Sequence, residues 1–190
     1  MGRLRIIAGE MKGRRIEVVD EAGLRPTADR VREALFSILG ERVAGALVLD
    51  VYAGTGALGF EALSRGSRHV VFVEGALPVV RGLERSRASL GCLDRSRVLH
   101  GDPVNLVSRG LLAGPFDLIL ADPPYGGDER VGFLAAVSGH ALLAEAGLLV
   151  LESESRKSPQ GGQNFPNLTH IRRAKYGRSA LDFYEPVVSG

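Results

Sequence analysis

Short apolar runs alternate with stretches of helical spacing through the middle of the chain. Five runs of four to six residues are rich in Val, Leu, Ile and Phe, as in parallel strands covered on both faces: 47–51, 69–73, 97–100, 116–121 and 148–152. Between them, Pro78 and Pro103 stand where helices would begin, and Gly66 and Gly91 where helices would end. This alternation predicts an α/β fold with a doubly wound, mostly parallel sheet.

The two ends of the chain depart from this alternation. Residues 4–8 and 14–19 predict a small N-terminal β-hairpin extension, followed by a helix that begins near Pro26 and Thr27 and ends at Gly40. Residues 168–175 and 180–188 predict two further strands around a turn at Gly177. Residues 156–167, rich in Ser, Pro, Gly, Gln and Asn, predict a loop.

Composition limits the class of protein. A chain of 190 residues that is 45% hydrophobic has enough apolar residues for one core but hardly for two. The single cysteine, Cys92, cannot form an internal disulfide, and the four histidines lack metal-site spacing. No apolar run approaches the roughly 18 residues of a membrane span, and the first residues do not resemble a signal peptide. We therefore expect a soluble cytoplasmic protein that binds neither membranes nor structural metal.

The net charge of +2 hides an uneven distribution of charge. Residues 1–32 carry eight Lys and Arg against five Asp and Glu, and no acidic residue stands between Glu154 and Asp182. Each basic stretch fits either a solvated surface or a site for a polyanion. Their position relative to a catalytic site decides between these interpretations.

A glycine-rich turn follows the run 47–51. Gly54, Gly56 and Gly59 match the dinucleotide fingerprint, which is weak evidence when taken alone. Asp50 precedes this turn, and its carboxylate would repel a pyrophosphate. It would favour the ammonium and sulfonium groups of S-adenosylmethionine, directly or through water. The residues therefore favour the methyl donor over NAD.

Further cofactor contacts are expected at the ends of the neighbouring strands. Glu74 stands twenty residues after Gly54, where a carboxylate accepts from ribose hydroxyls. Asp102, after the third strand, could accept from an adenine amino group, and Tyr52 lies in the turn itself. For both acidic residues the alternative is a solvated strand end. Glu61 is expected to be an ordinary residue on the surface of the following helix.

The fourth strand leads into Asp122-Pro123-Pro124-Tyr125. Ligands bind at this carboxyl edge of open α/β sheets, and the two prolines make the loop rigid. The exocyclic amine of a nucleic-acid base is a poor nucleophile because its lone pair is conjugated with the ring. Hydrogen bonds to Asp122 and to the Pro123 carbonyl could orient it, Asp122 could stabilise the charge that develops, and Tyr125 could stack on an extruded base. The alternative is an Asp-Pro turn with Tyr125 as a packing residue.

Together these motifs resemble the bacterial 16S ribosomal RNA (guanine-N2)-methyltransferases of the RsmD type. The resemblance covers nearly the whole chain through residues 5–9, 24–33, 49–59, 61–66, 122–125 and 176–177. It implies a seven-stranded class I methyltransferase domain at 23–190 after the hairpin extension at 1–22, with S-adenosylmethionine as cofactor and a flipped guanine as substrate. The chain departs from the family pattern at Gly75-Ala76-Leu77, after Glu74, and in residues 157–166.

This resemblance makes ribosomal RNA or the small ribosomal subunit the expected partner of a chain that we expect to be monomeric. The N-terminal cations are then candidate phosphate contacts: Arg3, Arg5, Lys12, Arg14, Arg15, Arg25, Arg30 and Arg32. Alternatively, Arg30 and Arg32 could pair with Asp29 and Glu33 on a helix surface.

Four other functions remain as alternatives. A DNA methyltransferase would use the same chemistry but would need a target-recognition region for which the chain has no room. A protein glutamine methyltransferase would more typically carry Asn in place of Asp122. An NAD-dependent oxidoreductase fits the glycine turn but not Asp50. A non-catalytic RNA-binding module would bind no methyl donor.

Overall fold

The computed structural model describes residues 4–18, 29–124, 129–159 and 164–187. The strands in these ranges are β1 Leu47–Val51, β2 His69–Glu74, β3 Ser96–His100, β4 Phe116–Ala121, β5 Leu143–Glu154, β6 Leu168–Tyr176 and β7 Ser179–Pro186. The α-helices are α1 Asp29–Leu39, α2 Ala57–Ser64, α3 Leu77–Leu90, α4 Pro103–Ser108 and α5 Glu129–Gly139, and two 3₁₀ turns lie at η1 Gly40–Val43 and η2 Leu93–Arg95.

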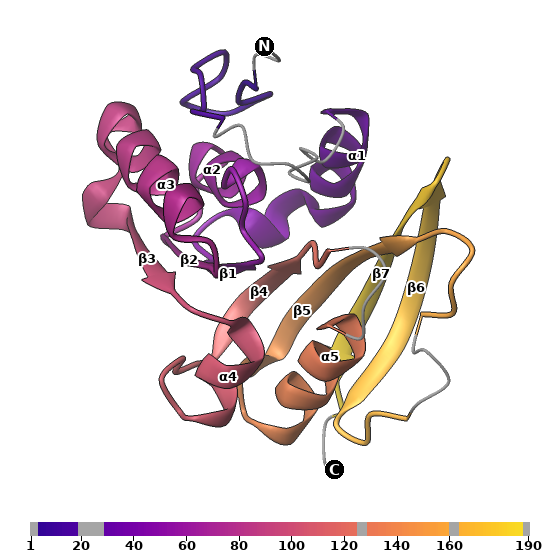
Figure 1. Cartoon of the computed structure of the whole chain (residues 1–190). Helices are drawn as coiled ribbons and strands as arrows, with labels where there is room; N and C mark the ends of the chain where they lie inside the picture. Colours follow the sequence, from indigo (N-terminus) through magenta and orange to yellow (C-terminus); the bar gives the residue numbers. More distant parts are fainter. Residues whose placement is uncertain (1–3, 19–28, 125–128, 160–163, 188–190) are drawn as a thin grey trace.

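The strands form a seven-stranded sheet with the order β3-β2-β1-β4-β5-β7-β6 (Figure 1). The pairs from β3 to β5 are parallel, whereas β7 is antiparallel to both β5 and β6. The predicted α/β fold with a mostly parallel, doubly wound sheet is confirmed. The strand order reverses between β1 and β4, the topological switch point where ligands of such sheets bind.

Helices cover both faces of the sheet. Helices α1, α2 and α3 lie on one face and α4 and α5 on the other (Figure 1). Successive residues of β1 alternate between two apolar clusters: Val48 belongs to the cluster that includes α1–α3 residues, and Leu49 to the one that includes α5 residues. Burial on both faces explains why the central strands are continuous apolar runs.

Helix ends follow local sequence. Pro103 opens α4, Pro78 is the second residue of α3, and Gly91 ends α3 in the left-handed conformation with φ 69°. The α-helix α1 ends at Leu39, directly before the predicted stop Gly40, whose φ is 52°, and the 3₁₀ turn η1 follows. The expected helix start at Pro26 and Thr27 lies outside the described residues.

The N-terminal segment, residues 4–18, has the two antiparallel arms of the predicted hairpin, but neither arm is a regular strand. Its two arms meet in an isolated antiparallel bridge between Arg5 and Arg15 and in three backbone hydrogen bonds, from the amides of Ile6, Gly13 and Ile16 to the carbonyls of Arg14, Ile6 and Leu4. Other backbone donors of the segment turn toward the helices: the amides of Ile7 and Ala8 donate to Glu61, and that of Glu17 to the Ser86 hydroxyl. These bonds satisfy outward-facing backbone donors of the segment and tie it to α2 and α3.

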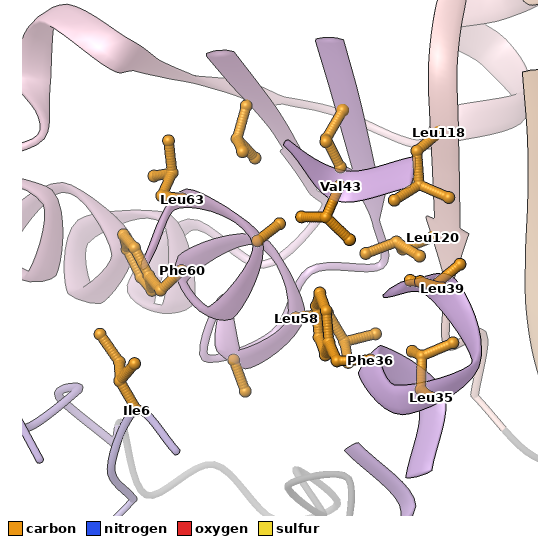
Figure 2. Packing of buried hydrophobic residues seen from close by; sticks show 14 of the residues in the cluster. Ile6, Leu35, Phe36, Leu39, Val43, Leu58, Phe60, Leu63, Leu118 and Leu120 are labelled. Carbon is orange, nitrogen blue, oxygen red and sulfur yellow. The ribbon is translucent and has the colours of Figure 1, made fainter. Parts of the chain in front are cut away.

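Nor is the N-terminal segment an appendage outside the core. Leu4, Ile6, Met11 and Ile16 are each at most 6% exposed and belong to the cluster formed with α1, α2 and α3. Figure 2 shows Ile6 on the side of α2 that carries Phe60. The segment therefore shares the core of the main domain.

The C-terminal pair of strands is fastened by a buried carboxylate. Asp182 on β7 accepts from Ser153 on β5 at 2.7 Å and from Arg173 on β6 at 3.1 Å, and His170 lies 3.2 Å from it. Arg173 also donates to the Glu154 carbonyl at 2.9 Å. One side chain thus joins three strands, and β5 extends to Glu154, beyond the predicted 148–152.

Candidate active site

Three neighbouring strands bring expected site residues to one edge of the sheet. Val51 of β1 pairs with Val73 of β2 and with Ala121 of β4. Tyr52, Glu74 and Asp122, each one residue further along its strand, therefore lie side by side at the carboxyl edge. The structure places these predicted residues together at the switch point.

Asp50 lies beneath the glycine turn. Its carboxylate is 2% exposed and accepts from the Gly59 amide at 2.8 Å, which fixes the first turn of α2 to β1. Burial raises the pKa of Asp50 well above its usual range, and the nearby charges of Asp122 and Glu74 add to that rise. Such burial does not fit the direct contact with a cofactor that we considered. The proximity of three carboxyl groups suits a cation, which would favour the ionised form of Asp50.

The turn itself uses backbone conformations that favour glycine. Gly54 and Gly56 have φ of 54° and 76°, and Tyr52 has φ 55°, which is uncommon for a residue with a bulky side chain. A Cβ on Gly56 would lie 2.6 Å from both Leu83 and Phe60. The chain can therefore pass tightly over the end of β1 only with glycine at this position.

Glu74 holds the turn from the neighbouring strand. One carboxylate oxygen accepts from the Gly54 amide at 2.9 Å and the other from the Ala76 amide at 2.8 Å. His100, opposite Glu74 on β3, contacts the Gly75 carbonyl at 3.0 Å. Each carboxylate oxygen has a second lone pair, so Glu74 can fix the turn and still accept from a ribose.

Asp102 has a local structural role. It is the N-cap of α4, and its Oδ1 accepts from the Asn105 amide at 2.8 Å. The residue is exposed at the same edge of the sheet, so a contact with an adenine amino group remains a prediction.

Asp122 and Pro123 follow β4 directly. Asp122 is half-buried and close enough to Asp50 for its charge to raise the pKa of that group, while Pro123 is buried and Pro124 exposed. The Tyr52 ring packs against Phe133 of α5, with 6.0 Å between ring centroids, beside the same loop. Tyr125 lies outside the described residues, so its stacking role remains a prediction.

Glu61, expected on a helix surface, is in fact fully buried. It accepts from the amides of Ile7 and Ala8 at 2.8 and 3.0 Å and from the Arg65 guanidinium at 2.8 Å. The expectation was wrong because all eight residues of α2 are buried, so this helix has no solvent face. The signal that could have indicated this is the apolar sequence around Glu61, which leaves no polar stripe.

Arg32 is also buried, although it was predicted to contact RNA. Its guanidinium is 0% exposed, pairs with Asp29 at 3.0 Å, donates to the Arg5 carbonyl at 2.7 Å and lies 3.9 Å from Glu61. Burial lowers the pKa of Arg32, and Asp29 and Glu61 oppose that shift. A phosphate cannot reach this position, so Arg32 joins the N-terminal segment to α1 and α2 instead.

The other predicted RNA contacts differ in their surroundings. Arg14 donates to the carbonyls of Ser89 and Leu90 at the end of α3, the latter at 2.8 Å, and Arg5 donates to the Gly13 carbonyl at 3.2 Å. The exposed residues Lys12, Arg15 and Arg30 have no ion pair with any described residue. Arg3 and Arg25 lie outside the described residues.

Two negative findings concern the described part of the chain. It contains no helix long and apolar enough to cross a membrane. Within the same ranges, no group of three or more His, Cys, Asp or Glu is arranged to hold a metal ion.

The fold and the site define the class of protein. A seven-stranded sheet with an antiparallel β7, a glycine turn after β1 and an acidic residue at the end of β2 is the arrangement of class I methyltransferases. The solved structure of the Escherichia coli protein described as "Putative methyltransferase yhhF" superposes with a TM-score of 0.85 and 32% identity, covering 97% of this chain and 98% of that one.

Sequence comparison gives the family. Residues 4–185 match the family described as Conserved hypothetical protein 95. The chain is 35% identical to ribosomal RNA small subunit methyltransferase D of Escherichia coli K12 over 80% of this chain and 76% of the relative. It is 33% identical to the Haemophilus influenzae protein of the same name over 82% and 81% of the two chains. The chain therefore belongs to this methyltransferase family, as the motifs indicated.

Proposed function

We propose that the protein transfers a methyl group from S-adenosylmethionine to the exocyclic N2 amine of a guanine in small-subunit ribosomal RNA. The observation that carries the proposal is the position of Asp122 and Pro123 directly after β4, beside the buried Asp50 and the glycine turn held by Glu74. The family relatives named for ribosomal RNA methylation support the substrate class.

The residues of the edge fit the methyl donor. The carboxyl groups of Asp50, Glu74 and Asp122 lie close enough to influence one another, and such a cluster suits a ligand that carries an ammonium and a sulfonium. Gly54 and Gly56 keep side chains out of the turn over which the ligand would lie. Glu74 would accept from the ribose and Asp102 from the adenine amino group. Asp50 would fix the turn, and a bound cation would favour its ionised form.

The donor supplies an electrophilic methyl group, and the chain's own residues prepare the amine to attack it. Asp122 and the Pro123 carbonyl would accept the two amine protons and aim the nitrogen. As the nitrogen–carbon bond forms and the sulfur–carbon pair stays with sulfur, the nitrogen becomes positive. The Asp122 carboxylate would stabilise that charge and take the released proton directly or pass it to water. Tyr125 would stack on the flipped guanine.

On this proposal, exposed cations of the N-terminal segment and α1 contact RNA phosphates. Four of these cations are exposed and suited to this role: Arg5, Lys12, Arg15 and Arg30. Arg14 is also exposed, but its guanidinium donates to two carbonyls at the end of α3. Arg3 and Arg25 stay in the proposed set on sequence grounds. The enzyme would act in the cytoplasm, where ribosomal subunits are assembled, and as a monomer.

Methylation assays with purified small subunits and with naked ribosomal RNA, followed by mass mapping of the nucleosides, test this function. N2-methylguanosine at one position is the expected product. Methylated adenine in DNA, a methylated glutamine side chain, or reduction of NAD without methyl transfer would each overturn the proposal.

The role of Asp122 has its own test. Asp122→Ala should lower kcat by roughly 10² or more, because it removes an interaction that strengthens in the transition state. The affinity for the demethylated donor, measured by calorimetry, should remain within a few-fold of wild type. Near-normal turnover of Asp122→Ala would exclude this carboxylate from the chemistry.

A further inference from the structure

Four exposed cations stand where the last strands project beyond the carboxyl edge of the sheet. We call this group the basic tip: Arg156 and Lys157 follow β5, Lys175 lies near the end of β6, and Arg178 is in the turn to β7. None of these residues belongs to the site described above.

Strand register places the basic tip on the catalytic side of the molecule. Ala121, just before Asp122, pairs with Leu151 of β5, and β5 then continues to Glu154, which pairs with Ser179 at the start of β7. At about 3.3 Å per residue, the tip extends roughly 10 Å past the level of Ala121. Strand spacings of about 4.8 Å put β6 on the order of 15 Å to the side of β4. In Figure 1 the β6–β7 turn reaches past the end of β4.

The backbone of the basic tip is held in place. The Ser155 amide donates to the Arg178 carbonyl at 2.7 Å, and the Ser155 hydroxyl donates to the Gly177 carbonyl at 2.9 Å. Arg173, anchored on the buried Asp182, donates to the Glu154 carbonyl at 2.9 Å. The backbone that carries the charges of the tip is therefore already ordered, so less conformational entropy is lost when a partner binds.

The charge of the basic tip is mostly uncompensated. Lys157 pairs with Glu154 at 3.2 Å. Among the described residues, no acidic side chain forms an ion pair with Arg156, Lys175 or Arg178. Clustered like charges repel one another, so a fold gains nothing from placing them together, whereas a polyanion binds them favourably.

The N-terminal cations have a different place in the fold. Lys12 and Arg14 lie beside the carboxyl ends of α2 and α3, and both helices start at the catalytic edge and run away from it. Those cations are consequently set back toward the opposite edge of the sheet. The basic tip, in contrast, extends past the carboxyl edge.

We propose that the basic tip contacts the RNA phosphate backbone beside the target guanine. This inference rests on the proposed function for its RNA partner. Phosphate contacts at the tip would position the RNA without reading its sequence.

A neutralised tip tests the proposal in the full-length protein. The triple variant Arg156→Gln, Lys175→Gln, Arg178→Gln is compared with a matched control that removes three exposed cations far from the carboxyl edge, Arg68→Gln, Arg97→Gln, Arg109→Gln. Binding to a fragment of small-subunit ribosomal RNA is measured over a salt series, and binding to the demethylated donor is measured by calorimetry. Phosphatidylglycerol vesicles serve as an alternative polyanion.

The tip variant should bind RNA more weakly, and its slope of log K against log salt should fall by about 2 to 3, because each phosphate that no longer meets a cation lowers the slope by about 0.7 to 0.9. The control should keep the wild-type slope, and both variants should keep donor affinity and melting temperature. A tip variant that behaves like the control overturns the proposal, as does loss of vesicle binding with RNA binding unchanged.

The same measurements separate this proposal from the proposed function. A wild-type protein that binds RNA through the tip but yields no N2-methylguanosine would refute only the function. One that methylates guanine with the tip neutralised and RNA binding unchanged would refute only the tip. Failure of the wild-type protein to bind RNA would refute both.

Discussion

Asp50 is a carboxyl group whose ionisation the fold opposes. Burial raises its folded-state pKa above the ordinary value of 3.8, so the folded state holds this proton more tightly than the unfolded chain. Between 3.8 and the raised folded-state value, unfolding releases the proton, and the contribution of Asp50 to stability therefore falls as pH rises.

Asp50→Asn should remove that pH dependence and unfold at neutral pH at a urea concentration no lower than wild type. Its amide oxygen can still accept from Gly59, while donor affinity should fall because Asn cannot ionise in response to the bound cation. Urea midpoints at several pH values measure the effect, with the exposed Asp94→Asn as control. Equal pH profiles for Asp50→Asn and wild type would contradict the expectation.

Glycine is needed at position 59 because there is no space for a side chain, and not because of its backbone conformation. A Cβ there would lie 2.3 Å from the Phe72 ring and 2.9 Å from the Asp50 carboxylate. Gly59→Ala should cost about 1 to 3 kcal/mol in the free energy of unfolding, because the core must shift to accept it. Gly139→Ala, where nothing lies within 4 Å, should change stability by less than about 0.5 kcal/mol. Denaturant unfolding measures the free energy of unfolding of both variants. A cost for Gly59→Ala as small as that for Gly139→Ala would show that the core around residue 59 can shift to accept a Cβ.

At the scale of elements, α2 joins two parts of the molecule. Its first turn is tied to β1 through Gly59 and Asp50, and its second half is tied to the N-terminal segment through Glu61 and Ser64. Movement of the N-terminal segment on RNA would therefore act on the helix that carries the glycine turn.

Breaking the buried pair tests how much α2 depends on it. Glu61→Ala leaves the Arg32 guanidinium buried without its second acidic neighbour and two backbone amides without acceptors, so it should destabilise the fold by about 3 to 5 kcal/mol. Glu33→Ala on the exposed face of α1 should change stability by less than about 0.5 kcal/mol. Equal denaturation midpoints for the two variants would show that the contacts of Glu61 contribute no more to stability than those of a surface residue.

At the scale of the whole molecule, the N-terminal segment supplies part of the hydrophobic core of the domain. Full burial of a large apolar side chain contributes about 1.5 to 3 kcal/mol, so Leu4, Ile6, Met11 and Ile16 together represent a large part of the roughly 5 to 15 kcal/mol that holds a domain folded.

A chain of residues 23–190 should consequently lose cooperative thermal unfolding or melt far below wild type. Calorimetry and limited proteolysis measure this, with Arg5→Ala/Arg15→Ala in the full chain as a control that keeps the buried side chains. If residues 23–190 melted cooperatively at the wild-type temperature, the N-terminal segment would be an independent extension as the sequence suggested.

The sequence predicted the sheet and the residues at its carboxyl edge because those features depend on local pattern. The runs that became β1 and β4 were apolar on both faces, and Asp50, Glu74 and Asp122 followed from their positions at strand ends. Glu61 and Arg32 were misplaced because charge indicates exposure unless a distant segment supplies the partner. The N-terminal hairpin was wrongly expected to be an appendage for the same reason, since its contacts with Glu61, Ser64 and Ser86 join residues far apart in the chain.

The attachment of the N-terminal segment also sets an order of events during synthesis. The Ile7 amide donates to a residue 54 positions later in the chain, and the Arg14 guanidinium donates to one 76 positions later. The N-terminal segment can thus reach its final place only after α3 has left the ribosome. Until then its apolar side chains lack the core against which they pack in the folded protein.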